Sequence, residues 1–332
     1  MSKQITAVAH ANIALVKYWG KRDQKLNLPA VGSISLTLQA LMTKTSVKFD
    51  PEIEGDRLTL NGFPADPAKN KRISDFLDLV RHRAGIEFYA QVQSENNFPT
   101  GAGLASSASA FAALTYAASE AAGLNLDGKE LSVLARQGSG SAARSIFGGF
   151  VEMHSGSQND GLDAYAEQLA PPSSWDLRMV IAITDEQEKK TGSTSGMTGS
   201  AETSPYYAAW IASSPDDIEI MRSAIRRKDL ERVGEMSEYS CMKMHALMLA
   251  TRPALIYWNG TTVDIFHQVR ELRGKNIPAW FTVDAGPQVK IITLPEYVAV
   301  VEKSIGKIAG VKRIISSGLG PDAHLTDEAH AG

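Results

Sequence analysis

The chain has 332 residues, a length that two domains sharing a cleft accommodate better than a single hydrophobic core. Its formal net charge of −3 argues against a general nucleic-acid binder, and no stretch of about 18 apolar residues predicts a membrane span. The single cysteine, Cys241, excludes an intramolecular disulfide and a cysteine-based metal site, which fits the reducing cytoplasm.

Residues 4–9 predict a strand that leads into the segment IALVKYWGKRD. In this segment Lys17 and Lys21 stand four residues apart beside Tyr18 and Trp19. Two ammonium groups at this spacing repel each other unless a carboxylate or another anion lies between them. We therefore favour an anion site here over a solvated face.

The next segments alternate between strand and helix patterns. Residues 33–49 alternate as strands do, and Asn61-Gly62 predicts a hairpin turn. Apolar residues at helical spacing predict a helix over Pro67–Ala84. Residues 88–93 predict another strand, which delivers the chain into a loop that contains glycine.

This loop, NNFPTGAGLASSAS, carries the first functional signal. Gly101 and Gly103 permit backbone conformations closed to other residues, and the small residues that follow predict a helix start near Leu104. A helix start suits a polyphosphate, and Ser106 and Ser107 add hydroxyl donors. A glycine turn before an alanine-rich core helix explains the stretch equally well. The loop lacks G-x-x-x-x-G-K-S/T, and Ser106 replaces the third glycine of G-x-G-x-x-G.

A second cluster of glycine and serine follows a helix predicted from Lys129. In QGSGSAARSIFGGF, the residues Ser139, Gly140 and Ser141 offer hydroxyls and amides, and Arg144 offers a guanidinium, at a new helix start. This combination predicts a second anion-binding helix start with an arginine clamp for a carboxylate or phosphate. A linker with a surface arginine is the weaker alternative.

A domain boundary is predicted at residues 160–175, where Pro171-Pro172 interrupts the pattern. We therefore expect domains over residues 1–176 and 177–332, the second opening with a buried strand. Residues 205–274 read as mostly helical, and their methionines are interpreted as core filling.

A polar loop follows the first strand of the second domain. Its residues Lys189, Lys190, Ser193 and Thr194 could reach an anion, although most such loops are plain connectors. Further along, two apolar strands flank Asp284. An acid at the end of an apolar strand is costly unless it is used, but an ordinary turn aspartate is the alternative.

The charged residues together indicate a reaction. The cations Lys17, Lys21, Arg72 and Arg144 outnumber those that one nucleotide needs, and the two glycine clusters suggest two phosphate-bearing molecules. Asp284 could accept a hydroxyl proton. The residues alone therefore predict ATP-dependent phosphoryl transfer to a small anionic alcohol.

The sequence also resembles one family closely. ANIALVKYWGKRD, NNFPTGAGLASSAS, RQGSGSAARSIFGGFVE, TGSTSGM with AETSP, and FTVDAGPQV resemble, in their order, the motifs of the diphosphomevalonate decarboxylase family in the GHMP kinase superfamily. The resemblance implies an α+β fold of two domains. It implies an S5-like N-terminal domain with a left-handed βαβ unit, an exception to the usual hand, and a ferredoxin-like C-terminal domain.

The resemblance implies an activity as well. The family uses ATP and Mg2+ to convert mevalonate 5-diphosphate into isopentenyl diphosphate, CO2, ADP and phosphate through transient phosphorylation of the 3-hydroxyl. It also implies a cytoplasmic homodimer with a small-molecule substrate and with no nucleic-acid or membrane partner.

Site residues follow from the same resemblance. It implies that Asp284 is the catalytic acid-base, that Lys17 lies beside it, and that Arg144 holds the substrate carboxylate. The positions that resemble the ATP-binding loop are Pro99, Gly101, Gly103, Leu104, Ala105, Ser106 and Ser107, with Ser106 also near the metal. The positions that resemble substrate-binding residues are Tyr18, Trp19, Gly20, Lys21, Arg72, Ser139, Gly140, Ser141, Ala142, Ala143, Arg144, Ser193 and Thr194.

Other functions remain open at this point. A relative that phosphorylates the 3-hydroxyl without decarboxylation, or one that uses mevalonate monophosphate, is the nearest alternative. A non-catalytic nucleotide-binding sensor predicts loss of the acid or of the loop serines, and neither is lost. An RNA-binding protein on the S5-like fold needs a basic surface, which the net charge disfavours.

Overall fold

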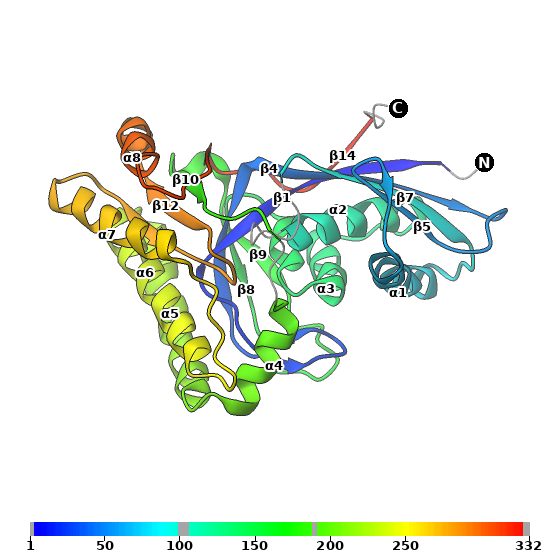
Figure 1. Ribbon diagram of the computed structural model, residues 1–332. Coiled ribbons are helices and arrows are strands. Elements are labelled where there is room, and N and C mark those ends of the chain that lie inside the picture. Colours follow the sequence, from blue (N-terminus) through cyan, green and yellow to red (C-terminus); the bar gives the residue numbers. More distant parts are fainter. Residues whose placement is uncertain (1–2, 99–105, 188–190, 328–332) are drawn as a thin grey trace.

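The computed structural model describes residues 3–98, 106–187 and 191–327. Figure 1 shows a long sheet in the N-terminal half and a smaller sheet in the C-terminal half, each covered by helices. The chain is therefore a mixed α/β protein of two parts, as predicted. Among the described helices, none combines the length and the apolar composition that a membrane span requires.

The long sheet is built around two strands that pair along most of their length. These are β1 (Ile5–Val16) and β4 (Ser33–Asp50), which are antiparallel. Within the described residues the main path of the sheet runs β14-β1-β4-β7-β5-β6, and β8 and β9 extend it from β4. The remaining strands of the long sheet are β5 (Arg57–Leu60), β6 (Phe63–Pro64), β7 (Tyr89–Asn96), β8 (Phe150–Met153), β9 (Ala166–Ala170) and, from the C-terminal end of the chain, β14 (His324–Thr326). A separate ribbon is formed by β2 (Lys21–Asp23) and β3 (Leu28–Pro29).

Helix α1 (Pro67–Ala84) confirms the sequence prediction at both ends. The Asp66 side chain accepts a hydrogen bond from the Lys69 amide, and proline occupies the first helical position, where its missing N–H costs nothing. Gly85 ends the helix in the left-handed conformation that glycine adopts most easily.

Two further helices pack beside α1 under the long sheet. Helix α2 (Ser106–Ala121) lies on β1 and β4, and its small side chains allow a close approach. Helix α3 (Gly128–Gly138) begins with a capping box in which Asp127 and Glu130 bond reciprocally. The observed start of α3 lies one residue before the predicted one, and the predicted start of α2 near Leu104 lies outside the described residues.

The C-terminal half has its own sheet, with the order β11-β12-β10-β13 among the described strands. Helices α5, α6, α7 and α8 cover this sheet and the back of the long one. The bounds are β10 (Arg178–Ile183), α4 (Ser193–Thr203), α5 (Tyr207–Arg227), α6 (Leu230–Leu249), α7 (Gly260–Gly274), β11 (Trp280–Thr282), β12 (Val289–Thr293), α8 (Val298–Ile305) and β13 (Arg313–Ser317), with short 3-10 helices η1 (Ala142–Ile146), η2 (Pro172–Ser174) and η3 (Pro295–Tyr297).

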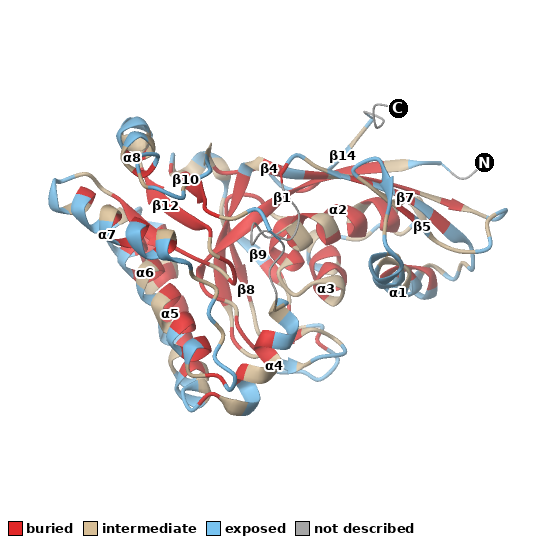
Figure 2. Ribbon diagram, in the orientation of Figure 1, coloured by how far each residue is buried: buried red, intermediate tan, exposed pale blue. Residues whose placement is uncertain are grey.

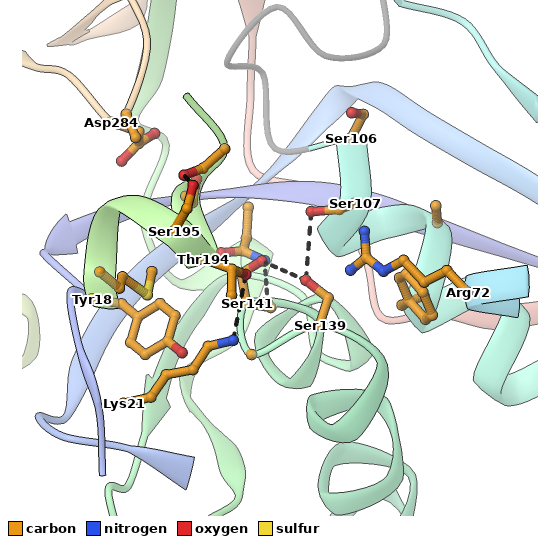
Figure 3. Close-up of a pocket in the computed structure, with 18 of the residues that line it drawn as sticks. Tyr18, Lys21, Arg72, Ser106, Ser107, Ser139, Ser141, Thr194, Ser195 and Asp284 are labelled. Carbon is orange, nitrogen blue, oxygen red and sulfur yellow. Dashed lines mark hydrogen bonds between the residues drawn. The ribbon is translucent and has the colours of Figure 1, made fainter. Parts of the chain in front are cut away.

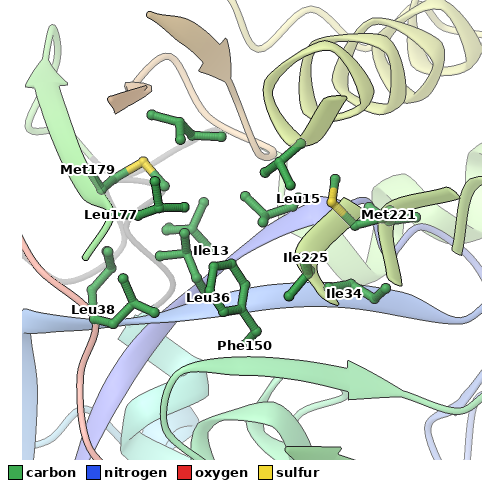
Figure 4. Packing of buried hydrophobic residues seen from close by; sticks show 14 of the residues in the cluster. Ile13, Leu15, Ile34, Leu36, Leu38, Phe150, Leu177, Met179, Met221 and Ile225 are labelled. Carbon is green, nitrogen blue, oxygen red and sulfur yellow. The ribbon is translucent and has the colours of Figure 1, made fainter. Parts of the chain in front are cut away.

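One apolar core joins the two halves. Ile13 and Leu36 of the long sheet pack with Met179 of β10 and Met221 of α5 (Figure 4). Figure 2 shows that both sheets and the inner faces of α5 and α6 are buried, whereas the outer helix faces are exposed. Because this core is continuous, the two halves hold a fixed relation in which a shared pocket can form.

Two local predictions were wrong, and one strand was not predicted. The predicted helix start after the second glycine cluster is the five-residue 3-10 helix η1, which offers fewer aligned amides than an α-helix. The polar segment at Ser193 is not a connector, because α4 begins there. No element was predicted beyond Gly320, where β14 pairs with β1.

A glycine contact provides a test of the packing between α6 and β11. A Cβ placed on Gly234 would lie 2.2 Å from the buried Trp280 ring. Alanine gains about 1 kcal/mol in helix propensity, but overpacking against a rigid indole typically costs more. We expect Gly234→Ala to lower the free energy of unfolding by about 1–3 kcal/mol in urea. Gly260→Ala, whose Cβ would meet nothing within 4 Å, should not destabilise the protein, and equal losses would contradict the packing described.

Candidate active site

A pocket of about 1120 Å3 opens where the two halves of the molecule meet. Side chains from β1, α1, α2, the segment before η1, α4 and the turn after β11 surround it (Figure 3). Cations, hydroxyls and the carboxyl groups of Asp284 and Glu202 line the pocket together with aliphatic side chains such as Leu58 and Val92. The pocket can therefore hold a ligand with both a charged and an apolar part.

The first turn of α2 borders the pocket with two hydroxyls. Ser106 and Ser107 both line it, and Ser139 donates a 3.4 Å hydrogen bond to the Ser107 hydroxyl (Figure 3). Amides at the start of a helix of this length carry partial positive charge that favours a phosphate. The predicted ATP-loop residues Pro99, Gly101, Gly103, Leu104 and Ala105 lie outside the described residues, as do Lys189 and Lys190.

Two cations face the pocket near these hydroxyls. Lys21 donates to Asn27 Oδ1 at 2.6 Å and to Thr194 Oγ1 at 3.4 Å, and Arg72 donates to the Gly138 carbonyl at 2.9 Å. Burial and then the positive charge of Arg72 lower the pKa of Lys21. Bringing two cations toward one space is unfavourable until an anion enters it. This region therefore fits a phosphate or diphosphate.

Tyr18 adds a hydroxyl to the same region. Its hydroxyl is buried and, within the part of the chain that the structure describes, has no hydrogen-bond partner. Burial raises the pKa of Tyr18 to about 12, so the group stays protonated and can donate. An unpaired buried hydroxyl costs free energy that an anionic ligand would recover. Tyr18 also contacts Gly140, where a Cβ would lie 2.5 Å from the hydroxyl oxygen.

Arg144 lines the pocket from η1 and is 3% exposed. Its Nε donates to Asn12 Oδ1 at 3.1 Å and its Nη1 donates to Ser33 Oγ at 2.6 Å. Asn12 is itself oriented because its Nδ2 donates to Ser145 Oγ at 2.7 Å. Burial lowers the pKa of Arg144 to about 10, which still leaves it charged at neutral pH. The guanidinium is thus fixed before any ligand binds.

Asp284 stands in the turn between β11 and β12 at the edge of the pocket. Lys17, at the end of β1, donates to its Oδ1 at 2.6 Å, and Lys290 of β12 lies 3.3 Å from its Oδ2. Burial alone would raise the pKa of Asp284, but the charges of Lys17 and Lys290 outweigh it and hold the pKa below the ordinary range. The carboxylate is therefore ionised and aligned.

The structure brings most of the predicted site residues together. Those that line the pocket are Tyr18, Trp19, Lys21, Arg72, Ser106, Ser107, Ser139, Gly140, Ser141, Arg144, Ser193, Thr194 and Asp284. Lys17, Ala142 and Ala143 are buried behind the pocket wall, and Gly20 has a positive φ and packs against Tyr207. The sequence predicted an anion between Lys17 and Lys21. In the structure the two side chains diverge, and Lys17 pairs with the carboxylate of Asp284 whereas Lys21 donates to Asn27.

Sequence reasoning missed three residues that hold the charged groups. Asn12 and Ser33 fix Arg144, and Lys290 contacts Asp284. Lys290 did leave a signal, because it is the charged residue inside the apolar strand VKIIT. Asn12 lies inside β1 and Ser33 begins β4, and a small polar residue at either place is common and gives no signal of its own.

The residues present fit a magnesium ion only if it arrives with a phosphate ligand. Among the described residues, no three histidine, cysteine or acidic side chains converge to hold a metal. Mg2+ keeps several waters and commonly binds through substrate phosphates with few protein ligands. The Ser106 hydroxyl at the start of α2 suits that arrangement.

Comparison with known proteins gives a consistent result. Residues 9–166 match the model of the diphosphomevalonate decarboxylase-like N-terminal domain, and residues 179–319 match that of the mevalonate 5-diphosphate decarboxylase C-terminal domain. A diphosphomevalonate decarboxylase of Candida albicans is 37% identical over 98% of both chains. The human one is 38% identical over 89% of this chain and 78% of its own.

Solved structures agree with the sequence comparisons. Mevalonate diphosphate decarboxylase from Staphylococcus aureus superposes with a TM-score of 0.93 at 38% identity, covering 98% of this chain and 99% of that one. A complex of MDDEF with MVAPP, AMPPCP and magnesium gives a TM-score of 0.91 with the same identity and coverage.

Proposed function

The chain belongs to the diphosphomevalonate decarboxylase family, and from this premise we propose that it catalyses the ATP-dependent decarboxylation of mevalonate 5-diphosphate. The products are isopentenyl diphosphate, CO2, ADP and phosphate. The observation that carries the proposal is the ionised Asp284, held by Lys17 beside a pocket that also contains the fixed Arg144.

The pocket has a separate region for each substrate. The start of α2, with Ser106 and Ser107, suits the phosphates of ATP, and the apolar region beside it suits the nucleoside. Tyr18, Lys21 and Ser139 suit the diphosphate of the acceptor. Asp284 lies at the edge of the same pocket, where the acceptor hydroxyl and the donor phosphate can meet.

In the first step the 3-hydroxyl oxygen attacks the γ-phosphorus of ATP, and the bond from phosphorus to the ADP oxygen breaks. An aspartate is far too weak a base to deprotonate a tertiary alcohol in advance. It can take the proton late, as the phosphoryl group crosses a loose transition state. Lys17 keeps the carboxylate ionised and oriented for that transfer.

In the second step the C3–O bond breaks and phosphate leaves with the bonding electrons. Positive charge develops at C3, the bond between the carboxylate carbon and C2 breaks, and its electron pair forms the alkene as CO2 departs. Arg144 holds the carboxylate in line with the leaving group, which its rigid pair of bonds to Asn12 and Ser33 makes possible. When bound with ATP, Mg2+ would neutralise charge on the phosphates, and the Ser106 hydroxyl would be a candidate ligand for it.

The direct test supplies the purified enzyme with ATP, Mg2+ and mevalonate 5-diphosphate and measures ADP and CO2. We expect equal amounts of both products. ADP without CO2 would leave only a 3-kinase, and turnover with the monophosphate at equal efficiency would indicate the phosphomevalonate relative. ATP binding without either product would indicate a nucleotide sensor.

The unpartnered hydroxyl of Tyr18 gives a second prediction. Tyr18→Phe removes one hydrogen bond to a charged group, worth about 1.5–3 kcal/mol. We therefore expect the KM for mevalonate 5-diphosphate to rise by about tenfold or more, with the KM for ATP nearly unchanged. The matched control is Tyr239→Phe on the exposed face of α6. An unchanged KM in Tyr18→Phe would remove the hydroxyl from the substrate site.

We also propose a domain boundary, an oligomeric state and a cellular location. The boundary between the two domains lies after residue 176, just before β10. From the family resemblance we infer that the protein is a homodimer in the cytoplasm. The single cysteine, Cys241, is buried, which suits a reducing compartment. Sedimentation at micromolar concentration should give twice the chain mass of 35.8 kDa, and a monomer would contradict the dimer.

A further inference from the structure

We propose that Lys290 is a positioning residue that works with Lys17 to fix both oxygens of the Asp284 carboxylate and sets the pH range in which that carboxylate acts. The inference rests on the proposed function and deepens it. It concerns a residue that touches the reaction only through Asp284, since Lys290 does not line the pocket among the described residues.

The geometry assigns one ammonium group to each carboxylate oxygen. Lys17 Nζ is 2.6 Å from Oδ1, and Lys290 Nζ is 3.3 Å from Oδ2. Lys17 reaches Asp284 from the end of β1 in the long sheet, whereas Lys290 belongs to β12 of the smaller sheet. A carboxylate held from two sheets cannot rotate about its terminal bond without losing one contact. Its remaining lone pairs keep a fixed direction toward the pocket.

The burial of Lys290 indicates that its contact with Asp284 carries a desolvation cost. Its side chain is 0% exposed, and both strand neighbours, Val289 and Ile291, are also 0% exposed. In the sheet it stands opposite Ile181 of β10 and Thr282 of β11. A buried ammonium is expensive unless an opposite charge compensates it, and a methionine would fill the same space more cheaply. Asp284 supplies the opposite charge.

Other titratable groups also face this cluster. Cys241 and His245 approach from α6, and Arg144 approaches from η1. Burial raises the pKa of Cys241 to about 11, so the thiol is uncharged. Burial, followed by the charge of Lys17, lowers the pKa of His245 to about 3, so the ring is neutral. Trp258 Nε1 donates a hydrogen bond to His245 Nε2, with 3.2 Å between the two nitrogens, and a neutral ring can supply an acceptor there.

Three cations therefore face one carboxylate in the described part of the cluster. Burial lowers the pKa of Lys290, and Asp284 opposes that shift. Removing the Lys290 charge takes away one of the cations that favour ionised Asp284, so the carboxyl pKa must rise. Activity that needs ionised Asp284 is lost as pH falls through that pKa. The acid limb of the profile of kcat against pH should therefore move to higher pH.

The experiment compares the wild type with Lys290→Met, Lys290→Arg and Lys243→Met by measuring kcat and KM across the pH range with saturating Mg2+. In Lys290→Met we expect the acid limb to move upward by about one to three pH units, as loss of one close charge predicts. We also expect kcat near neutral pH to fall about 10- to 100-fold, with the KM for ATP within about twofold. In Lys290→Arg the charge remains, so the acid limb should stay near that of the wild type even where the larger head group lowers kcat.

Lys243 provides the matched control, because it pairs with the buried Asp217 between α5 and α6, away from the pocket. Lys243→Met should lower thermal stability without moving the acid limb. An acid limb in Lys290→Met that coincides with the wild type, or an equal shift in Lys243→Met, would overturn the inference while leaving the proposed function intact. A wild type without turnover at any pH would instead refute the proposed function, and the inference with it.

Discussion

Asp284→Asn should lower kcat by about two to four orders of magnitude, the range that removal of a general base produces, while the Kd for ATP stays within about twofold. Asparagine has the same shape, and its Oδ1 can still accept the 2.6 Å hydrogen bond from Lys17. Its amide cannot take the hydroxyl proton. The phosphoryl transfer would then have no acceptor for that proton except water.

The unfolding midpoint of Asp284→Asn must be measured together with its kcat. The substitution leaves Lys17 and Lys290 buried without their counter-charge, which should also lower the unfolding midpoint. Asp185→Asn is the control, because Asp185 is a partly exposed partner of Lys312 at 3.5 Å outside the pocket lining. Turnover at the wild-type rate in folded Asp284→Asn would remove this residue as the base.

Arg144→Lys should lower the rate of CO2 release about 100-fold, the scale of effect expected from a misplacement of about 1 Å. A single ammonium cannot reproduce the bonds from Nε to Asn12 and from Nη1 to Ser33 while also holding a carboxylate in plane. Phosphorylation needs this alignment less than decarboxylation does. We therefore expect ADP to form faster than CO2, so that the product ratio departs from one.

The control for this prediction is Arg222→Lys. Arg222 makes a two-pronged ion pair with the buried Glu152 and links α5 to β8, outside the pocket lining. Arg222→Lys should reduce stability but leave the amounts of ADP and CO2 released equal. If Arg144→Lys also releases equal ADP and CO2 at the wild-type rate, the guanidinium has no role in orienting the carboxylate.

The sequence predicted those elements whose signals are local. Helix α1 was predicted to the residue because Asp66, Pro67 and Gly85 mark its ends and its apolar positions recur at helical spacing. Asp284 was identified because an acid in an apolar strand end is costly, and the structure places Lys17 and Lys290 on its two oxygens. Lys290 follows Asp284 closely along the chain, whereas Lys17 is 267 residues away.

The remaining features depend on contacts that no local pattern encodes. The segment that forms α4 is rich in glycine, serine and threonine, which favour a loop, but Met197 and Gly196 pack it against Trp19. Strand β14 has three residues and exists through its pairing with β1. Asn12 and Ser33 acquire their role only where the fold brings Arg144 to them.

The central claim is that a donor triphosphate and an acceptor diphosphate meet beside one carboxylate. The most direct measurement is a crystal structure of this chain with mevalonate 5-diphosphate, Mg2+ and a non-hydrolysable ATP analogue. We predict the 3-hydroxyl oxygen within about 2.6–3.2 Å of an Asp284 carboxylate oxygen, with the terminal phosphate on its other side. A 3-hydroxyl that contacts neither Asp284 nor the terminal phosphate, in a complex with both ligands bound, would contradict the account.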